Sequence, residues 1–530
     1  MSMHFSHSAP WSPRPLQRES AHAAAWIDFI LIFALALALR LHDLGTKPFW
    51  IDEVMTKLRV ALPPGQLISD SLDHHHLPAY FLLLSQLSPG VNPWLLRLPS
   101  AVAGALAAAL GVPVGRRLAE GIGAARTGGL ISGLLLAAAP IMVQSGQDAR
   151  PYSLELAGLM LSLWGLLSLA RNAEAAGGTW RRGAGPWSAL IIGMIGAFAT
   201  IGNALPFLLV ANVAVWPIAR SLSGAARRTF LLRWVCGQAI VLLAVAPMYL
   251  AMGHSVDDDY MAAFNWVPPL DGMRAWRVAA DVYLLRTANV ANLHLLPIGL
   301  PILGAVALLL AGAGLIALRR QPAACLIMAL AVVALPVLLV VSEPARPLWL
   351  PRYLLWSGAA FLLLTALGSA WLARGRCMLA SAVAAFLLLL NVRPFYAAET
   401  APRWDLAAAA LAPALASGAD LFLDDHGVPT MLRAYLPTPQ AALVKDRVVY
   451  QLGEAEARLR AGVPVIAIHG HTGQERTSRI AAFRAQVGQL GTPAEDVRIG
   501  QEIEMIRVDP PPPAAAGPGV AQQSDAPPKT

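Results

Sequence analysis

Cysteine is scarce in this sequence, with only 3 among 530 residues: Cys236, Cys325 and Cys377. All three lie inside apolar runs, so the sequence predicts neither a disulfide framework nor a cysteine metal site. Charge is scarce as well, because Asp, Glu, Lys and Arg together make up only 14% of the residues. That fraction is well below the value typical of soluble domains, which excludes an ordinary soluble enzyme.

Acidic residues are fewer than basic ones, 32 against 40, which gives a net charge of +8. A basic chain can bind nucleic acid, but these arginines lie in short segments between apolar runs and form no continuous basic stretch. We therefore expect no nucleic-acid partner and interpret the arginines as signals of membrane topology.

Long apolar runs are what the sequence has in abundance: 56% of its residues are hydrophobic and the mean hydropathy is +0.54. A helix needs about 20 apolar residues to cross the bilayer. The sequence thus predicts a polytopic α-helical membrane protein with about eleven transmembrane helices, near residues 24–41, 94–115, 124–144, 153–170, 187–202, 204–219, 234–252, 294–318, 323–341, 353–373 and 377–393.

Segment 77–89 is apolar but short and bounded by prolines, which favours an interfacial or re-entrant helix. With that choice and a cytoplasmic segment 1–23, the first helix is an uncleaved anchor and the basic loops satisfy the positive-inside rule. These cytoplasmic arginines are Arg116, Arg117, Arg126, Arg171, Arg181, Arg182, Arg220, Arg227, Arg228, Arg233, Arg319, Arg320, Arg374 and Arg376. The outer segments are then 42–93, 253–293, 342–352 and everything beyond 394. Counting 77–89 as a crossing would invert everything after it.

The pattern changes beyond residue 394. A helix-like stretch at 402–416 is followed by the strand-like runs ADLFLDD, VPVIAIH and EIEMIRV, with helical patterns between them. We predict a small periplasmic α/β domain over 394–508. The Pro- and Ala-rich tail 509–530 cannot bury a core and is predicted to be disordered.

Three polar clusters fall at outer ends of predicted helices. Asp52 and Glu53 follow the first span in WIDEV, His74, His75 and His76 precede the short apolar segment, and QDARPY places Asp148, Arg150 and Tyr152 after another span. Acidic residues also favour the first turn of a helix, and a histidine triplet also suits a solvated turn. Because the three clusters share one face of the membrane, we expect them to contribute to a common site.

Arg150 and Arg352 lie on the outer side at the edge of the hydrocarbon, where an unpaired cation is costly. Each is predicted to have an anionic partner, either a carboxylate in an ion pair or a bound phosphate, which the planar guanidinium suits. The acidic run Asp257 to Asp259 and the HGHTG segment from His469 to Gly473 are better explained as a solvated turn and a strand-to-helix turn.

WIDEV, the His76-x-Pro78-x-Tyr80 segment, QDARPY and PRYL together resemble the C-type (GT-C) glycosyltransferases of bacterial inner membranes. This group includes protein O-mannosyltransferases of glycosyltransferase family 39 and lipid A aminoarabinose transferases. The resemblance covers roughly residues 24–393 and implies a GT-C-like fold with the active site on the periplasmic side. The sequence departs from the commonest pattern at HLPAY, where many relatives have two prolines, and at QDARPY, where glutamate often replaces the aspartate.

The resemblance implies the role of each matching residue. Asp52, Glu53 and Asp148 would be catalytic, with Asp52 as the essential carboxylate, while the lipid phosphate and the sugar would be bound by His76, Tyr80, Arg150, Tyr152, Arg352 and Tyr353. Asp52 and Asp148 would also suit a divalent metal such as Mg²⁺ or Mn²⁺, since hard cations take carboxylate oxygens. We leave that cofactor open.

The cytoplasmic loops are too short to hold a nucleotide-sugar domain, and the predicted site faces outward. We therefore expect a polyprenyl-phosphate sugar as donor, a lipid, protein or glycan as acceptor, and an inverting displacement with Asp52 as the base. A polytopic transporter or lipid flippase is the alternative, and it predicts inverted repeats and ionisable residues at mid-membrane.

Overall fold

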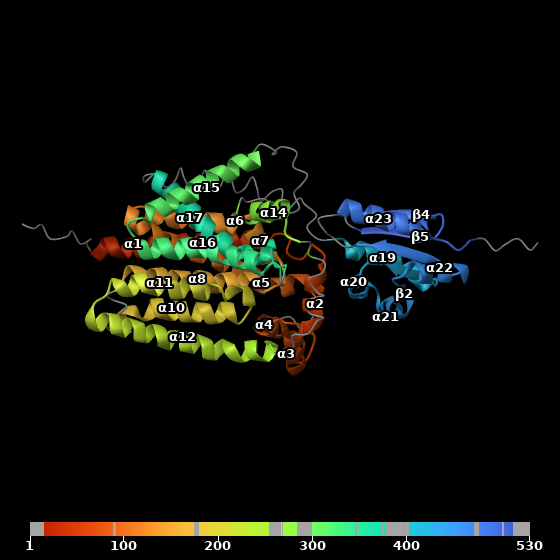
Figure 1. Cartoon of the computed structure of the whole chain (residues 1–530), viewed down its shortest axis with the longest axis horizontal. Coiled ribbons are helices and arrows are strands. Elements are labelled where there is room, and N and C mark those ends of the chain that lie inside the picture. The colour runs from red at the N-terminus through yellow and green to blue at the C-terminus, as the bar shows by residue number, and fades with distance from the viewer. Residues whose placement is uncertain are drawn as a thin grey trace, which may run out of the picture. The chain divides into compact units, whose positions relative to one another are not determined.

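The computed structural model describes residues 15–87, 92–173, 180–253, 267, 269–283, 299–344, 347–373, 376, 396, 402–470, 476–500 and 503–511. The chain divides into two compact units, Met1–Thr400 and Ala401–Thr530, which are described separately. Figure 1 shows the first unit as a bundle of long helices and the second as a mixed helix and sheet structure.

The first unit is entirely helical in its described part. Its helices are α1 Pro15–Leu41, α2 Ile51–Val60, α3 Pro64–Asp73, α4 Ala79–Leu87, α5 Pro93–Ala119, α6 Ala125–Ala138, α7 Pro140–Gln147, α8 Tyr152–Arg171, α10 Trp180–Phe198, α11 Phe207–Arg220, α12 Gly224–Gly253, α14 Gly272–Tyr283, α15 Gly299–Ala317, α16 Pro322–Ser342 and α17 Leu355–Ala373. Short 3-10 turns lie at η1 Glu120–Ile122, η2 Gly202–Ala204 and η3 Pro351–Leu354.

Seven of these helices, some extended by a 3-10 turn, are long and apolar enough to cross a membrane: Ala23–Leu41, Pro93–Ile122, Tyr152–Arg171, Gly202–Arg220, Gly224–Gly253, Pro322–Ser342 and Pro351–Ala373. The pair α6 and α7 makes an eighth span if its two parts are counted together. The multi-pass membrane architecture predicted from the sequence is thus confirmed. Among the other expected spans, 187–202 and 294–318 correspond to shorter apolar helices, Gly183–Phe198 and Gly304–Ala317, and 377–393 lies outside the described residues.

The expected span 124–144 is broken instead of straight, because α6 and α7 meet at an angle of 56°. Pro140 has no N–H and its ring crowds the carbonyl four residues earlier, which leaves the last carbonyls of α6 without helical partners. Arg40 of α1 takes up two of them. Its buried guanidinium donates to the backbone oxygens of Leu136 and Ala137 at 3.3 and 3.0 Å, and to that of Met142 in α7 at 3.1 Å. Arg40 therefore satisfies backbone carbonyls on both sides of the break and holds α7 at its angle to α6.

Three short helices, α2, α3 and α4, gather at one end of the bundle (Figure 1). Within 77–87, the described part of the segment 77–89, the helix is the nine-residue α4, which is too short to cross, in keeping with its prediction as an interfacial helix. In the expected outer loop 253–293 the described part contains α14, and its Arg274 donates to Glu343 and to the backbone oxygen of Trp349, both at 3.0 Å.

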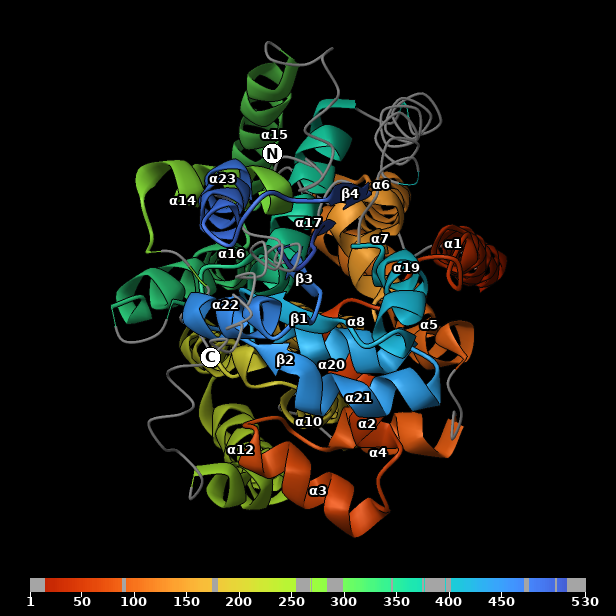
Figure 2. The same cartoon turned by 90° about the vertical axis from the view of Figure 1, so that its right-hand side faces the viewer.

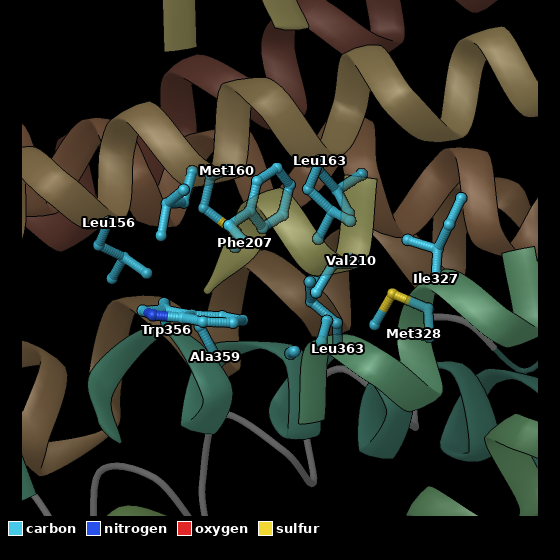
Figure 3. Packing of buried hydrophobic residues seen from close by; sticks show 14 of the residues in the cluster. Leu156, Met160, Leu163, Phe207, Val210, Ile327, Met328, Trp356, Ala359 and Leu363 are labelled. Carbon is cyan, nitrogen blue, oxygen red and sulfur yellow. The ribbon is translucent and has the colours of Figure 1, made fainter. Parts of the chain in front are cut away.

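Close packing of α8, α11, α16 and α17 forms the centre of the bundle. Figure 3 shows how side chains from these helices interlock, among them Met160, Phe207, Met328 and Trp356. Helices α15 and α17 approach so closely that a Cβ on Gly368 would clash with the backbone oxygen of Leu310 on α15, so only glycine fits there. Seen along the bundle, α15 and α12 lie at opposite edges of the first unit (Figure 2).

The second unit is a small α/β domain. It contains helices α19 Trp404–Ala416, α20 Val428–Tyr435, α21 Thr438–Arg447, α22 Leu452–Arg460 and α23 Arg476–Gly488 and strands β1 Asp420–Leu423, β2 Val448–Val449, β3 Val465–His469, β4 Glu495–Ile499 and β5 Ile503–Val508. The strand order is β2-β1-β3-β5-β4, with β2, β1 and β3 parallel and the last two pairings antiparallel. The helix at 402–416 and the three strand-like runs coincide with α19, β1, β3 and β5.

Candidate functional site

Charged side chains from three distant segments meet at the end of the bundle that carries α2, α3 and α4. Asp52 lies in the first turn of α2, Arg150 in the turn between α7 and α8, and Arg352 in η3, which leads into α17. Because each segment sits at a helix end, the backbone fixes its position relative to the others. Asp52 and Arg150, from two of the three predicted clusters, thus meet here, and Arg150 and Arg352 each have a carboxylate partner, one of the two kinds of anion that the sequence predicted.

Asp52 is the centre of this cluster. Its Oδ2 lies 3.8 Å from Nη2 of Arg150 and 3.6 Å from Nη1 of Arg352. The Asp52 side chain is 26% exposed, whereas Arg150 is 7% exposed. Two guanidinium groups thus share one partly accessible carboxylate, which leaves an excess positive charge in a largely buried place.

Glu53, the next residue, points into the protein instead. It forms a bidentate pair with Arg97 of α5, with both N–O distances 2.7 Å, and it accepts a hydrogen bond from the Ala149 amide at 2.8 Å. Arg97 also donates to the backbone oxygens of Leu44 and Lys47, both at 2.9 Å. The pair ties α2 to α5 and to the turn before Arg150, and it therefore holds Asp52 in place. Its predicted catalytic role stays a prediction.

Asp148 stands beside the cluster in the α7–α8 turn. Burial raises the pKa of this carboxyl, and the Glu53 carboxylate raises it further, while Arg97 and Lys47 oppose the effect. Burial also lowers the pKa of Lys47 to about 8. Asp148 is accordingly a carboxyl that holds its proton more tightly than Asp residues usually do, next to a lysine that gives its proton up more readily.

Tyr80 is linked to the Arg150 backbone through a chain of hydrogen bonds. The fully buried Tyr80 hydroxyl lies 2.7 Å from Oγ of Ser100. The Ser100 hydroxyl in turn donates to the backbone oxygen of Arg150 at 2.9 Å. Tyr80 was predicted to bind substrate, but the structure places it as a contact that positions the Arg150 backbone. The role itself stays untested.

His76 follows α3 and is half-buried, with its ring at 5.9 Å from that of Phe81. Burial lowers the pKa of His76 well below its usual value, and the nearby Arg150 and Arg59 lower it further, so the imidazole is neutral. His74, in contrast, is exposed at the end of α3, where Nδ1 lies 2.7 Å from the backbone oxygen of Asp70. The triplet is therefore a helix-ending turn in which His74 is exposed and His76 is half-buried, near enough to Arg150 for its charge to act on the imidazole.

Aromatic rings flank Arg352. Its guanidinium carbon lies 5.4 Å from the ring centroid of Trp50 and 5.5 Å from that of Tyr353, close enough for cation–π attraction. Tyr353 in turn meets Tyr152 edge to face at 6.3 Å. Asn203 fixes the backbone here by donating to the Tyr353 oxygen at 3.1 Å.

A divalent metal does not fit this donor set well. Among the described residues no group of three or more His, Cys, Asp or Glu side chains is arranged to hold a metal ion. Asp52 already neutralises two guanidinium groups, so the pair Asp52 and Asp148 would give a cation little net negative charge. We assign no step to a metal.

Several residues of the site escaped the sequence prediction. Arg97, Lys47, Arg59 and Trp50 were not singled out, although Arg97 and Arg59 are buried and paired with carboxylates, Arg59 with Asp70 at 2.6 Å. The signal that was available is that a buried arginine on the predicted outer side requires an acidic partner. Asp257 to Asp259 lie outside the described residues. His469 ends β3, is fully buried and bonds to Asp424 within the second unit.

The helix arrangement is similar to that of a solved membrane protein structure. ArnT from Cupriavidus metallidurans bound to undecaprenyl phosphate has a TM-score of 0.53 to this chain, with 16% identity over 92% of this chain and 98% of that one. The resemblance seen in the sequence is thus confirmed at the level of fold.

Two further solved structures are similar at a lower score. These are ArnT from the same organism in the apo state, with a TM-score of 0.49, 16% identity and 92% and 98% of the two chains covered, and the Archaeoglobus fulgidus oligosaccharyltransferase tethered to an acceptor peptide, with 0.49, 11%, 88% and 71%. No family model matches the sequence, and no curated protein does.

Proposed function

We propose that this protein is a membrane glycosyltransferase that moves a sugar from a polyprenyl-phosphate donor to an acceptor hydroxyl at the Asp52 cluster. The convergence of Arg150 and Arg352 on the single Asp52 carboxylate carries this proposal. The fold is one that supports such an enzyme, since a solved structure with this fold was obtained with undecaprenyl phosphate bound.

The charge balance of the cluster favours a phosphate ligand. Two arginines and one aspartate leave one net positive charge, and a lipid phosphate brings the missing negative charge. The bound phosphate would draw Arg150 and Arg352 toward its oxygens and release Asp52 from both ion pairs. Donor binding thereby prepares the base, because a carboxylate freed from two cations accepts a proton more readily.

The reaction is a single displacement. The acceptor oxygen attacks the anomeric carbon, and the bond from that carbon to the phosphate oxygen breaks as the new bond forms. The acceptor proton passes to Asp52, and the departing phosphate keeps the bonding electron pair, with Arg150 and Arg352 offsetting its charge. Attack from the face opposite the phosphate inverts the anomeric centre. Asp148 contributes a protonated carboxyl for a hydrogen bond to the sugar.

The positions of the arginines support an extracytoplasmic site in a bacterial inner membrane. The end of the bundle remote from Asp52 carries Arg116, Arg117, Arg126, Arg171, Arg220, Arg319 and Arg320, as the positive-inside rule requires of a cytoplasmic face. At the Asp52 end, buried arginines are paired with carboxylates, for example Arg97 with Glu53 and Arg274 with Glu343. The donor sugar would then be delivered on the periplasmic side, where lipid-linked sugars are the expected supply.

A transporter finds less support in the placement of charges. Asp28 is buried near the arginine-rich end of α1 and pairs with Arg126 at 3.1 Å. Glu155 is buried one turn into α8, next to the Asp52 end. The buried carboxylates of these two spans therefore lie near their ends and not at the midplane, where a transport site would place them.

Asp52→Asn tests the proposal. Membranes containing wild type or the variant would be given total lipid-linked sugars from cells that possess this chain, and transfer would be followed by mass spectrometry of envelope lipids, glycans and proteins. We expect the variant to fold but to lose transfer by a factor of about 10²–10⁴, the usual contribution of a general base. Asp43→Asn, at an exposed position before α2, is the matched control and keeps full transfer. Wild-type transfer by Asp52→Asn would overturn the assignment of the base.

A further inference from the structure

A cavity lies at the end of the bundle opposite the Asp52 cluster. It has a volume of about 480 Å³ and is formed where α5, α8 and α11 end and α16 begins. Helix α8 runs from the Asp52 cluster to this cavity, and its 20 residues separate the two sites by about 30 Å. The cavity is therefore distinct from the proposed transfer site.

The polar wall of this cavity carries an excess of positive charge. Arg117 and Arg171 both line it, and both pair with the one carboxylate of Glu120, at 3.1 and 2.7 Å. Two cations thus share one anion. Gln321 completes the wall. Its Oε1 accepts from Arg171 at 3.3 Å, and its side chain packs so closely over Gly121 that a Cβ on this glycine would clash with the Gln321 Nε2.

The remaining wall is apolar. Leu118, Leu167 and Ile218 line it, and Pro217 follows Trp216, which is 61% exposed and lies under the guanidinium of Arg220 at 4.1 Å. An exposed tryptophan beside an arginine is the usual anchor at the boundary between lipid tails and headgroups. The cavity therefore opens at headgroup depth, with a charged part and an apolar part.

We infer that this cavity binds the headgroup of a net-anionic phospholipid from the leaflet opposite the Asp52 cluster. The phosphate pairs with Arg171 and Arg117, and the glycerol end of the lipid rests on Leu118 and Ile218. The first-turn N–H groups of α16, at Ala323 and Ala324 in the lining, add partial positive charge. This site is independent of the reaction proposed at Asp52.

The test measures lipid retention by the intact protein. Wild type in mixed micelles would be presented with phosphatidylglycerol or phosphatidylcholine, which share the phosphodiester but differ in net charge, and bound lipid would be counted by native mass spectrometry. We expect wild type to retain phosphatidylglycerol roughly five-fold or more over phosphatidylcholine, as a charge-assisted contact at a half-exposed site predicts.

Arg171→Gln should abolish this preference, because it leaves Arg117 and Glu120 as a neutral pair without exposing an unpaired carboxylate. Ala170→Phe fills the apolar part without changing any charge and should reduce retention of both lipids. Arg228→Gln, which removes an exposed charge from α12 at the same end outside the cavity, is the matched control and should leave the preference intact.

Each other outcome overturns the inference. An unchanged preference in Arg171→Gln would mean that the cavity does not select the lipid. An equal loss in Arg228→Gln would mean that only the overall charge of this face matters. Displacement of phosphatidylglycerol by millimolar inorganic phosphate would identify a soluble phosphate compound as the occupant instead of a lipid.

Discussion

Replacing Glu53 with glutamine tests whether the two adjacent acidic residues of α2 have different roles. We expect Glu53 to support the fold and Asp52 to take part in the chemistry. The Glu53 side chain is 1% exposed and its partner Arg97 is 3% exposed. Glutamine keeps an oxygen for the Ala149 amide but removes the charge that neutralises Arg97. Breaking one partner of a buried ion pair costs about 3–5 kcal/mol, so we expect a clear loss of stability in Glu53→Gln.

Asp52→Asn should behave in the opposite way. Its two ion pairs are long, at 3.8 and 3.6 Å, and its side chain is 26% exposed, so they contribute less to stability than the short buried pair of Glu53. We therefore expect a smaller loss of stability than in Glu53→Gln, together with a loss of turnover. Melting curves of the two purified variants in one detergent, together with transfer rates per folded molecule, give the comparison directly.

A double variant, Glu53→Gln with Arg97→Gln, completes the cycle. If the two side chains act as a pair, the double variant loses less stability than the sum of the single losses, by about 0.5–3 kcal/mol. It stays less stable than wild type, because Arg97 also holds the backbone oxygens of Leu44 and Lys47. A Glu53→Gln protein that melts like wild type but has lost turnover would refute this reasoning and give Glu53 a direct part in the reaction.

Further changes have defined outcomes. Burial and the Glu53 carboxylate raise the pKa of Asp148 to about 7. Between the unfolded pKa of about 4 and this folded value, the unfolded chain gives up the proton that the folded protein keeps. Wild type should therefore lose more stability than Asp148→Asn as the pH rises from about 4 to 7, and the two should run parallel above that range, in melting curves from about pH 4 to 9. Gly104→Ala places a methyl 2.6 Å from Nε of Arg40 and should lower stability by about 1–3 kcal/mol in denaturation assays. Arg352→Lys keeps the charge but loses the planar fork, so KM for the lipid donor should rise while the melting curve stays unchanged. Chelation with EDTA should leave transfer rates unaltered, whereas a loss restored by Mg²⁺ or Mn²⁺ would establish a metal requirement.

Much of the fold was predictable because membrane spans leave a strong signal in composition. The apolar runs located the long helices, and the arginines that break the charge rule pointed to the end of the bundle where Arg150 and Arg352 meet Asp52. Both predictions rest on the free-energy cost of placing charge in hydrocarbon. That cost can be judged from each segment of the sequence by itself.

The finer assignments were beyond the sequence because they depend on direction. Consecutive residues on a helix point about 100° apart, so WIDEV could not show that Asp52 faces the cluster while Glu53 faces Arg97. The break at Pro140 was missed for a similar reason, since the length and hydropathy of 124–144 suit a straight span and Arg40 compensates from a distant helix. Strand β4 also gave no signal, because its residues are mostly exposed.

The long separation of Asp52, Arg150 and Arg352 along the chain has a consequence for biosynthesis. A ribosome delivers the aspartate first and the second arginine only after most of the crossings have entered the bilayer. Until η3 arrives, Asp52 and Arg150 can offset each other as a neutral couple, which spares the half-made chain an unpaired charge. The surplus cation that would attract a phosphorylated lipid exists only once assembly is almost finished, so an incomplete chain would not capture donor.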